Sequence, residues 1–164
     1  MSEYIFNDCN EEPYTEYGID GDSFHDLLRV CARYCPVMSV AVLPTDEEVL
    51  SVIRQFLLDE KDVPLYQQEK KMAGYLVIHG TKLYEQYYRV CPGLLNELAN
   101  IASDDLFTML HGWGYTNPED PTFYRADGSI FFESVVHEGA CYLHARKDED
   151  VDMIIRNPGW RRQI

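Results

Sequence analysis

The segment that most constrains the fold runs from residue 121 to residue 147, with the sequence PTFYRADGSIFFESVVHEGACYLHARK. Asp127-Gly128 separates two runs of aromatic and β-branched residues, and such a pair suits the tight turn of a β-hairpin, whose central residues need positive φ. Glu138-Gly139 marks a second turn, where a bulge or a longer loop is an alternative because Glu resists positive φ. The segment therefore predicts an antiparallel meander of three strands. The strands are expected over residues 122–126, 129–137 and 140–147.

Two-residue turns would fix the register of this meander, and the register decides which side chains share a face. The residues expected opposite one another are Phe123 and Phe132, Tyr124 and Phe131, and Glu133 and His144. One face is then apolar and is expected to lie in the core: Phe123, Ile130, Phe132, Val136, Cys141, Leu143 and Ala145. The other face is mixed: Tyr124, Phe131, Glu133, Val135, His137, Tyr142, His144 and Arg146.

Outside the meander, apolar residues recur mostly at the spacing of helices, with short apolar runs between them. Helices are expected over residues 23–35, 45–59, 82–90 and 92–102. Residues 82–90 also fit a strand, because tyrosines are common in strands. Further strands are expected over residues 37–43 and 74–79.

These patterns predict an α+β fold, in which an antiparallel sheet built on the C-terminal three-strand meander (about 121–147) packs against several helices. A chain of 164 residues is long enough for a hydrophobic core, so one domain over residues 1–164 is expected. Residues 1–21 are rich in acids and tyrosines and contain Pro13 and Gly18. They predict an irregular or partly extended acidic N-terminal arm, and the aromatic residues favour docking of at least part of it.

The formal net charge of −14 restricts the partners of this protein. Such a charge repels phosphate backbones and anionic lipid surfaces, so neither nucleic acid nor a membrane is expected as a direct partner. No apolar run approaches the roughly 18 residues that cross a bilayer, and the first residues lack the basic and apolar regions of a signal peptide. Five cysteines at irregular spacings fit a reducing compartment. A cytoplasmic location is therefore expected.

The sequence contains no motif that names a reaction: no phosphate-binding glycine loop, no GxSxG, no HExxH and no paired CxxC. An inhibitor or toxin-immunity protein that neutralises a basic nuclease or nucleic-acid-binding enzyme would look like this, acidic and without catalytic motifs. We expect this function, without a cofactor. The expected contacts combine acidic clusters with two aromatics of a glycine-containing loop. They are Glu11, Glu12, Glu16, Asp20, Asp22, Asp46, Glu47, Glu48, Trp113 and Tyr115.

An enzyme or small-molecule binder is the alternative. Glu133 opposite His144 could orient the imidazole and raise its pKa, as general acid–base catalysis uses. Tyr124 and Tyr142 would stand beside this pair. A substrate would reach the cluster only if the mixed face of the meander is open.

A metal site would require a different local structure. On a helix, His137, Cys141 and His144 would share one face and could bind zinc. The turn at Glu138-Gly139 opposes this arrangement, because it sends Cys141 to the face opposite His144. A third hypothesis is an assembly module that self-associates through exposed tyrosines.

Overall fold

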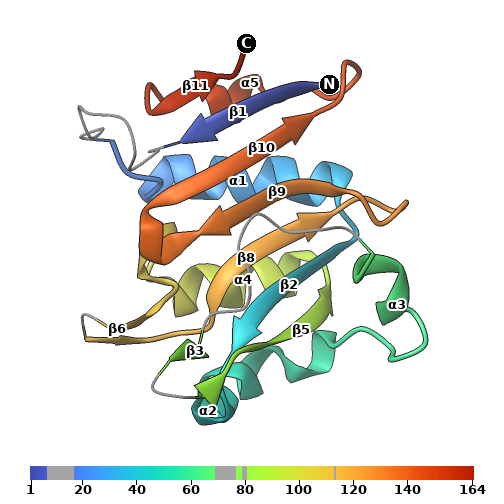
Figure 1. Ribbon diagram of the computed structural model, residues 1–164, viewed down its shortest axis with the longest axis vertical. Coiled ribbons are helices and arrows are strands. Elements are labelled where there is room, and N and C mark those ends of the chain that lie inside the picture. Colours follow the sequence, from blue (N-terminus) through green and yellow to red (C-terminus); the bar gives the residue numbers. More distant parts are fainter. Residues whose placement is uncertain (7–16, 69–76, 79–80, 113) are drawn as a thin grey trace.

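The fold is α+β, as predicted, with helices packed against a seven-stranded antiparallel sheet (Figure 1). The computed structural model describes residues 1–6, 17–68, 77–78, 81–112 and 114–164. The strand order of the sheet is β11-β1-β10-β9-β8-β2-β5. Its strands are β1 (Ser2–Phe6), β2 (Val37–Val42), β5 (Tyr84–Arg89), β8 (Glu119–Tyr124), β9 (Ile130–Val135), β10 (Ala140–Ala145) and β11 (Trp160–Arg162).

Two helices, α1 (Gly21–Tyr34) and α4 (Pro92–Ile101), lie behind the sheet in Figure 1. Both were expected from their apolar spacing. The shorter helices are α2 (Glu47–Leu50), α3 (Val63–Tyr66) and α5 (Asp152–Ile155), and the 3-10 turns are η1 (Pro44–Asp46), η2 (Ser51–Phe56), η3 (Leu106–Thr108) and η4 (Val136–Glu138). Two small ladders complete the fold: β3 (Val77–Ile78) with β4 (Thr81–Lys82), and β6 (His111–Gly112) with β7 (Tyr115–Thr116).

The core lies between the sheet and the two longer helices. Helix α1 contributes Phe24, Leu27 and Cys31, and α4 contributes Leu94 and Leu98, all at helical spacing and all buried. The sheet contributes alternate residues of its strands, among them Phe6, Met38, Val40, Tyr88, Phe123, Phe132 and Leu143. Full burial of one such side chain stabilises the fold by about 1.5–3 kcal/mol. The helical spacing in α1 and α4 and the alternation in the strands therefore decide which faces pack together.

The first hairpin of the meander differs from the predicted two-residue turn. Arg125 N–H donates to Ser129 C=O and Gly128 N–H donates to Arg125 C=O, each at 2.9 Å, so the loop holds three residues and ends on Gly128 at a φ of 85°. This is a turn followed by a glycine bulge, which matches strand twist as well as the predicted turn does. Phe123 lies opposite Phe132, as predicted.

β9 has one residue more than β8 near the turn, and this extra residue, Phe131, has no partner directly opposite. Tyr124 lies opposite Ile130 and not opposite Phe131, as was predicted. Phe131 packs into the helix-side core, where its ring lies 5.6 Å from that of Tyr34. A bulge re-aims side chains in this way, so the assignment of Phe131 to the mixed face was wrong. The assignment of Ile130 to the core face with Phe123 was wrong as well, because Ile130 packs with Tyr124 in a second apolar cluster.

The second turn shifts the register of β10 by two residues. Val136–Glu138 forms the 3-10 turn η4, which Gly139 closes at a φ of 67°. Glu133 consequently lies opposite Tyr142, not opposite His144. A shift of two residues leaves every side chain of β10 on its predicted face, because side chains alternate with a period of two.

Residues 2–6 of the predicted N-terminal arm are extended and form β1 between β10 and β11. Phe6 at its end is fully buried, with its ring 5.3 Å from the Trp160 ring. Tyr4 also packs against the core, whereas Glu3 is exposed. This alternation is that of a strand with one face inward, and the acidic composition of the arm obscured it.

One further helix prediction was wrong, and another was right only in part. Residues 84–89 form the edge strand β5, in which consecutive tyrosines face opposite sides of the sheet, so Tyr87 and Tyr88 belong to different apolar clusters. The helix expected over residues 45–59 is a short α2 between two 3-10 turns. Asp46 fixes the start of this segment, because its Oδ2 accepts a hydrogen bond from Leu43 N–H at 2.7 Å.

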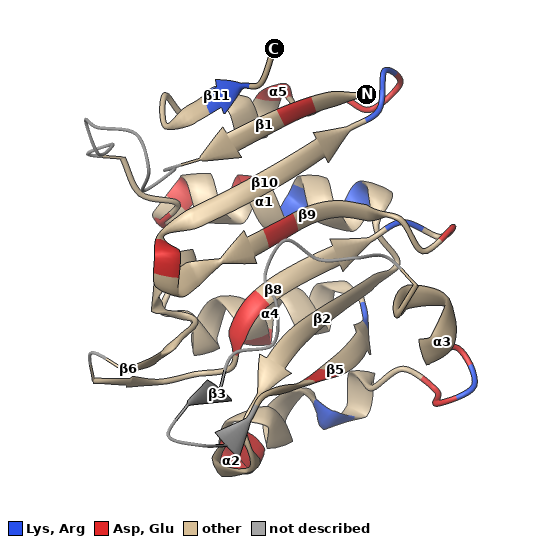
Figure 2. Ribbon diagram, viewed as in Figure 1, with Lys and Arg blue, Asp and Glu red and all other residues tan. Residues whose placement is uncertain are grey.

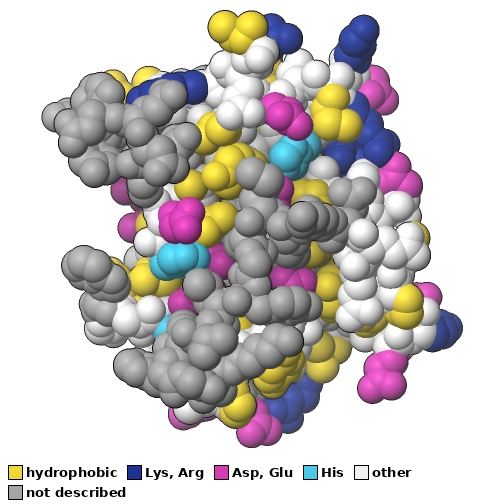
Figure 3. All heavy atoms as spheres, viewed as in Figure 1, with side chains coloured by type: hydrophobic (Ala, Val, Ile, Leu, Met, Phe, Trp, Pro, Cys, Tyr) yellow, Lys and Arg dark blue, Asp and Glu magenta, His cyan; other side chains and the backbone are white. Residues whose placement is uncertain are grey.

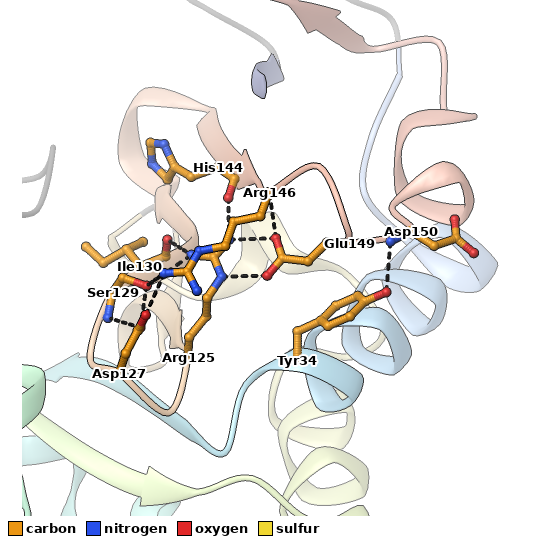
Figure 4. A network of polar contacts seen from close by, with 9 residues as sticks. All are labelled: Tyr34, Arg125, Asp127, Ser129, Ile130, His144, Arg146, Glu149 and Asp150. Carbon is orange, nitrogen blue, oxygen red and sulfur yellow. Dashed lines mark hydrogen bonds and ion pairs between the residues drawn. The ribbon is translucent and has the colours of Figure 1, made fainter. Parts of the chain in front are cut away.

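A buried arginine holds the meander to the chain that follows it (Figure 4). Arg125 donates from Nη1 to the Ile130 carbonyl oxygen at 2.6 Å and from Nη2 to the His144 carbonyl oxygen. Two further hydrogen bonds reach the carboxylate of Glu149 in the loop after β10. One guanidinium thus joins β9, β10 and that loop.

Candidate functional site

On the sheet face away from α1 and α4, a carboxylate and an imidazole of neighbouring strands touch. His144 Nε2 lies 2.8 Å from Glu133 Oε1. Because Glu133 is opposite Tyr142, the imidazole reaches it diagonally, which long side chains can do across a strand pair. The two residues predicted as a pair are therefore in contact, although they are not directly opposite.

Two carboxylates and partial burial set the charge of His144. Glu133 is buried, whereas the His144 side chain is 20% exposed. Glu3 Oε1 of β1 lies 3.6 Å from His144 Nδ1. The hydrogen bond with Glu133 raises the pKa of His144, partial burial opposes the rise, and Glu3 adds to it. In Figure 3, histidine side chains lie beside carboxylates both on the upper sheet and at its left edge.

The two tyrosines predicted beside this pair differ in position. Tyr142 lies opposite Glu133 in the register. Tyr124 is fully buried, its hydroxyl lies 3.1 Å from Ser39 Oγ, and its ring packs edge-on against that of Tyr66. Burial raises the pKa of Tyr124, which keeps the phenol protonated. Tyr124 therefore belongs to a second apolar cluster, with Val37, Tyr66, Tyr87 and Ile130.

Acidic segments meet at one end of the sheet, where β2 and β9 end and β8 and β10 begin. We call residues 17–26, 43–48, 102–120 without residue 113, and 136–139 the acidic end. Several contacts join these segments. An isolated backbone β-bridge joins Asp20 to Asp105, His111 Nε2 lies 2.7 Å from Asp46 Oδ1, and Val136 N–H donates to Asp120 Oδ1 at 2.7 Å.

The predicted partner contacts fall partly on this end. The exposed ones are Asp20, Asp22, Glu47, Glu48 and Tyr115. Asp46 was expected at the surface but is buried, because its carboxylate caps η1 and pairs with His111. Glu11, Glu12, Glu16 and Trp113 lie outside the described residues.

A buried acidic cluster lies just inside the acidic end, and sequence reasoning missed it. His111 stands between Asp46 and Glu119, with its Nδ1 3.5 Å from Glu119 Oε1. Asp46 and Glu119 are each 1% exposed. Asp46 and His111 are 65 residues apart in the chain, so no local spacing announces the pair. The nearest signal was the sequence Glu119-Asp120 at the start of a strand, a place where carboxylates are uncommon.

Glu119 also belongs to a group that could hold a metal ion. One ligand atom each of Glu119, Asp120 and His137 lies within 4.8 Å of the others. The zinc set considered from the sequence, with Cys141 and His144 beside His137, does not come together. Residues 136–145 form a turn and a strand, and Cys141 lies in the core, where burial raises the pKa of its thiol.

Among the described residues, no helix has the length and apolar character needed to cross a membrane. Comparison with protein-family models, curated proteins and solved structures finds no match for this chain. The function is therefore argued from the charges and contacts above.

Proposed function

We propose that this chain is an acidic binding protein of the inhibitor or toxin-immunity type, and that its acidic end holds a basic partner protein. The main observation in support is the negative charge of that end. Each of its four segments contains carboxylates, and none contains Lys or Arg. Such a surface attracts a basic partner and orients it during the encounter.

Few basic residues reach this end: Arg54 pairs with Glu47, and Arg29 and Arg156 pair with Asp26. In Figure 2, the left edge of the described structure, with the start of α1 and the turn after β9, carries red segments, whereas blue segments lie to the right, at the top and beside α2 at the bottom. Helix α1 repeats the pattern, with Asp22 and Asp26 in its first half and Arg29 and Arg33 in its second. The separation supports a one-sided binding surface rather than evenly spread charge.

Several carboxylates of the acidic end keep their charge uncompensated. Asp20, Asp22 and Glu48 are exposed and form no ion pair with any residue that the structure describes. By contrast, exposed Asp127, in the turn between β8 and β9 at the opposite end of these strands, pairs with Arg146 at 2.6 Å. Uncompensated carboxylates are the ones that can pair with a partner at little cost in lost intramolecular contacts.

A groove of about 480 Å³ gives this surface a docking point. Asp20 and Asp22 line it together with Asp26 and Tyr17, and Tyr17 is 51% exposed. Arg156 already binds Asp26, so the charge of the groove comes from the other two carboxylates. A Lys or Arg side chain of the partner could pair with them while its stem lies on the tyrosine ring.

A pull-down from host lysate at low ionic strength tests the proposal. The expected result is a basic protein that is released as salt is added, because screening weakens contacts between exposed charges. Recovery of no basic protein at low salt would contradict it.

Matched charge reversals locate the surface. Asp20→Lys with Asp22→Lys should weaken the recovered complex by about tenfold or more, equivalent to roughly 1.4 kcal/mol. Asp59→Lys with Glu60→Lys is the control, because these residues are also exposed and the change in net charge is the same. Equal losses from both pairs would mean that net charge, and not the acidic end, drives binding.

A second candidate function is a small-molecule binder or enzyme that uses Glu133 and His144. The observation in its favour is the partly exposed imidazole between two carboxylates, with a raised pKa. Nuclear magnetic resonance screening with small organic acids and amines tests it. Binding should shift the His144 ring resonances, and Glu133→Gln should abolish the shift. If no compound perturbs His144, this candidate fails.

A further inference from the structure

We propose that Glu119, Asp120 and His137 bind one divalent transition-metal ion at the acidic end. Two carboxylate oxygens and one imidazole nitrogen lie within 4.8 Å of one another there. Ligand atoms about 2.0–2.2 Å from one ion lie at most about 4.4 Å apart, so the three ligand atoms need to approach one another by only about an ångström. The site uses other residues than the groove proposed for the partner, so a test of one does not decide the other.

An orphaned buried oxygen points to a ligand at this place. Glu119 is 1% exposed, and its Oε1 accepts a hydrogen bond from His111 N–H at 2.7 Å. Its Oε2 is buried and, like His111 Nδ1, has no hydrogen-bond partner among the residues that the structure describes. Buried carboxylate oxygens are normally satisfied, so an unsatisfied one leaves a position that a cation can fill. A metal ion bound by Glu119 would supply that charge.

The backbone holds the other two ligands in place. Asp120 sits at the left-handed φ of 52°, an uncommon conformation for a residue with a side chain. Val136 N–H donates to Asp120 Oδ1 at 2.7 Å, which ties the start of β8 to the turn η4 that carries His137. The three ligands are therefore set by one strand end and one turn before any ion arrives.

His137 also provides the route for the ion. Its side chain is 30% exposed, whereas Glu119 and Asp120 are buried, so an ion can reach the carboxylates past the imidazole. Glu138 Oε1 lies 3.7 Å from His137 Nε2. The many carboxylates of the acidic end would raise the local concentration of any cation.

The donor set selects the class of ion. Ca²⁺ takes six to eight oxygen ligands and Mg²⁺ keeps most of its water, so an imidazole suits neither. Two carboxylates with one imidazole suit Zn²⁺ or Mn²⁺, with a water completing the coordination. The hydrogen bond from His111 N–H to Glu119 orients the carboxylate, as outer partners of metal ligands do.

Isothermal titration of the metal-free chain with Zn²⁺ tests this site, with Mg²⁺ titrated in parallel. We expect one tight Zn²⁺ site per chain and a loss of affinity of at least about tenfold in His137→Ala. His25→Ala is the matched control, because His25 is also an exposed histidine beside a carboxylate, Asp104, at 2.9 Å. That variant should bind Zn²⁺ as the unchanged chain does.

A second readout does not depend on titration heats. Zn²⁺ should raise the thermal midpoint of the unchanged chain and of His25→Ala, because an ion that binds only the folded state stabilises it. The rise should be absent in His137→Ala, and in Glu119→Gln if circular dichroism shows that variant to be folded. The proposal is overturned if Zn²⁺ does not bind, or if His137→Ala and His25→Ala respond alike.

Discussion

Arg125 and Glu149 form a two-pronged ion pair, with Nε 2.6 Å from Oε1 and Nη2 2.7 Å from Oε2. Both side chains are nearly buried, 5% and 7% exposed. The same guanidinium binds the main chain of β9 and β10, so the pair fastens the hairpin to the loop beyond the meander. Removal of one member of such a buried pair destabilises a fold strongly, because the other charge stays buried without a partner.

Glu149→Ala should therefore lower the free energy of unfolding by about 3–5 kcal/mol, because it leaves Arg125 buried without its counter-charge. Urea denaturation followed by circular dichroism measures the change. Asp150→Ala is the neighbouring control. Its partner Arg33 is 3.7 Å away at the surface, and such a pair contributes at most about 1 kcal/mol. Similar losses in the two variants would contradict the role given to Arg125.

His144 should make stability fall as the pH rises. Its folded-state pKa is raised, chiefly by the hydrogen bond with Glu133, so protonated His144 favours the folded state. That contribution is complete below the unfolded pKa of about 6.5 and is lost as the pH rises through the higher folded-state value. The difference in unfolding free energy between the unchanged chain and His144→Gln should shrink over this range. A constant difference from pH 5 to pH 9 would be the contrary result.

Gly159 should not tolerate a methyl group. A Cβ at this position would lie 2.2 Å from Cε2 of the Phe6 ring, which is fully buried and cannot withdraw. Gly159→Ala should therefore destabilise the fold by about 1–3 kcal/mol through overpacking. Adding Phe6→Leu, which removes the ring, should recover part of that loss in a double-mutant cycle. Strictly additive losses would show that the strain arises elsewhere.

The meander was predictable because its signals are local. Gly128 and the alternation around it fix a hairpin from a few adjacent residues. The loop lengths were not predictable, because nothing in Val136–Glu138 distinguishes a 3-10 turn from the end of a strand. The contact between Glu133 and His144 nevertheless survived, since the resulting shift by two residues kept both on one face.

The buried cluster at the acidic end was not predictable for a different reason. Asp46 looks like a helix-capping acid and His111 like a loop residue, and only the packed fold brings them together. Likewise, the tyrosines of β5 fit a helix or a strand equally well until the neighbouring β2 supplies hydrogen-bond partners. Long-range pairing overrides local preference in both places.

The position of β1 also sets an order of events in time. Ser2–Phe6 is synthesised before every other strand of its sheet, whereas its two neighbours there, β10 and β11, are the last of the seven strands to be made. β1 therefore stays unpaired until residues 140–162 have been synthesised, and Phe6, which is buried in the folded protein, stays exposed to other proteins until then. The sheet can close only after β10 and β11 exist, which makes early chaperone contact with β1 valuable and folding comparatively slow.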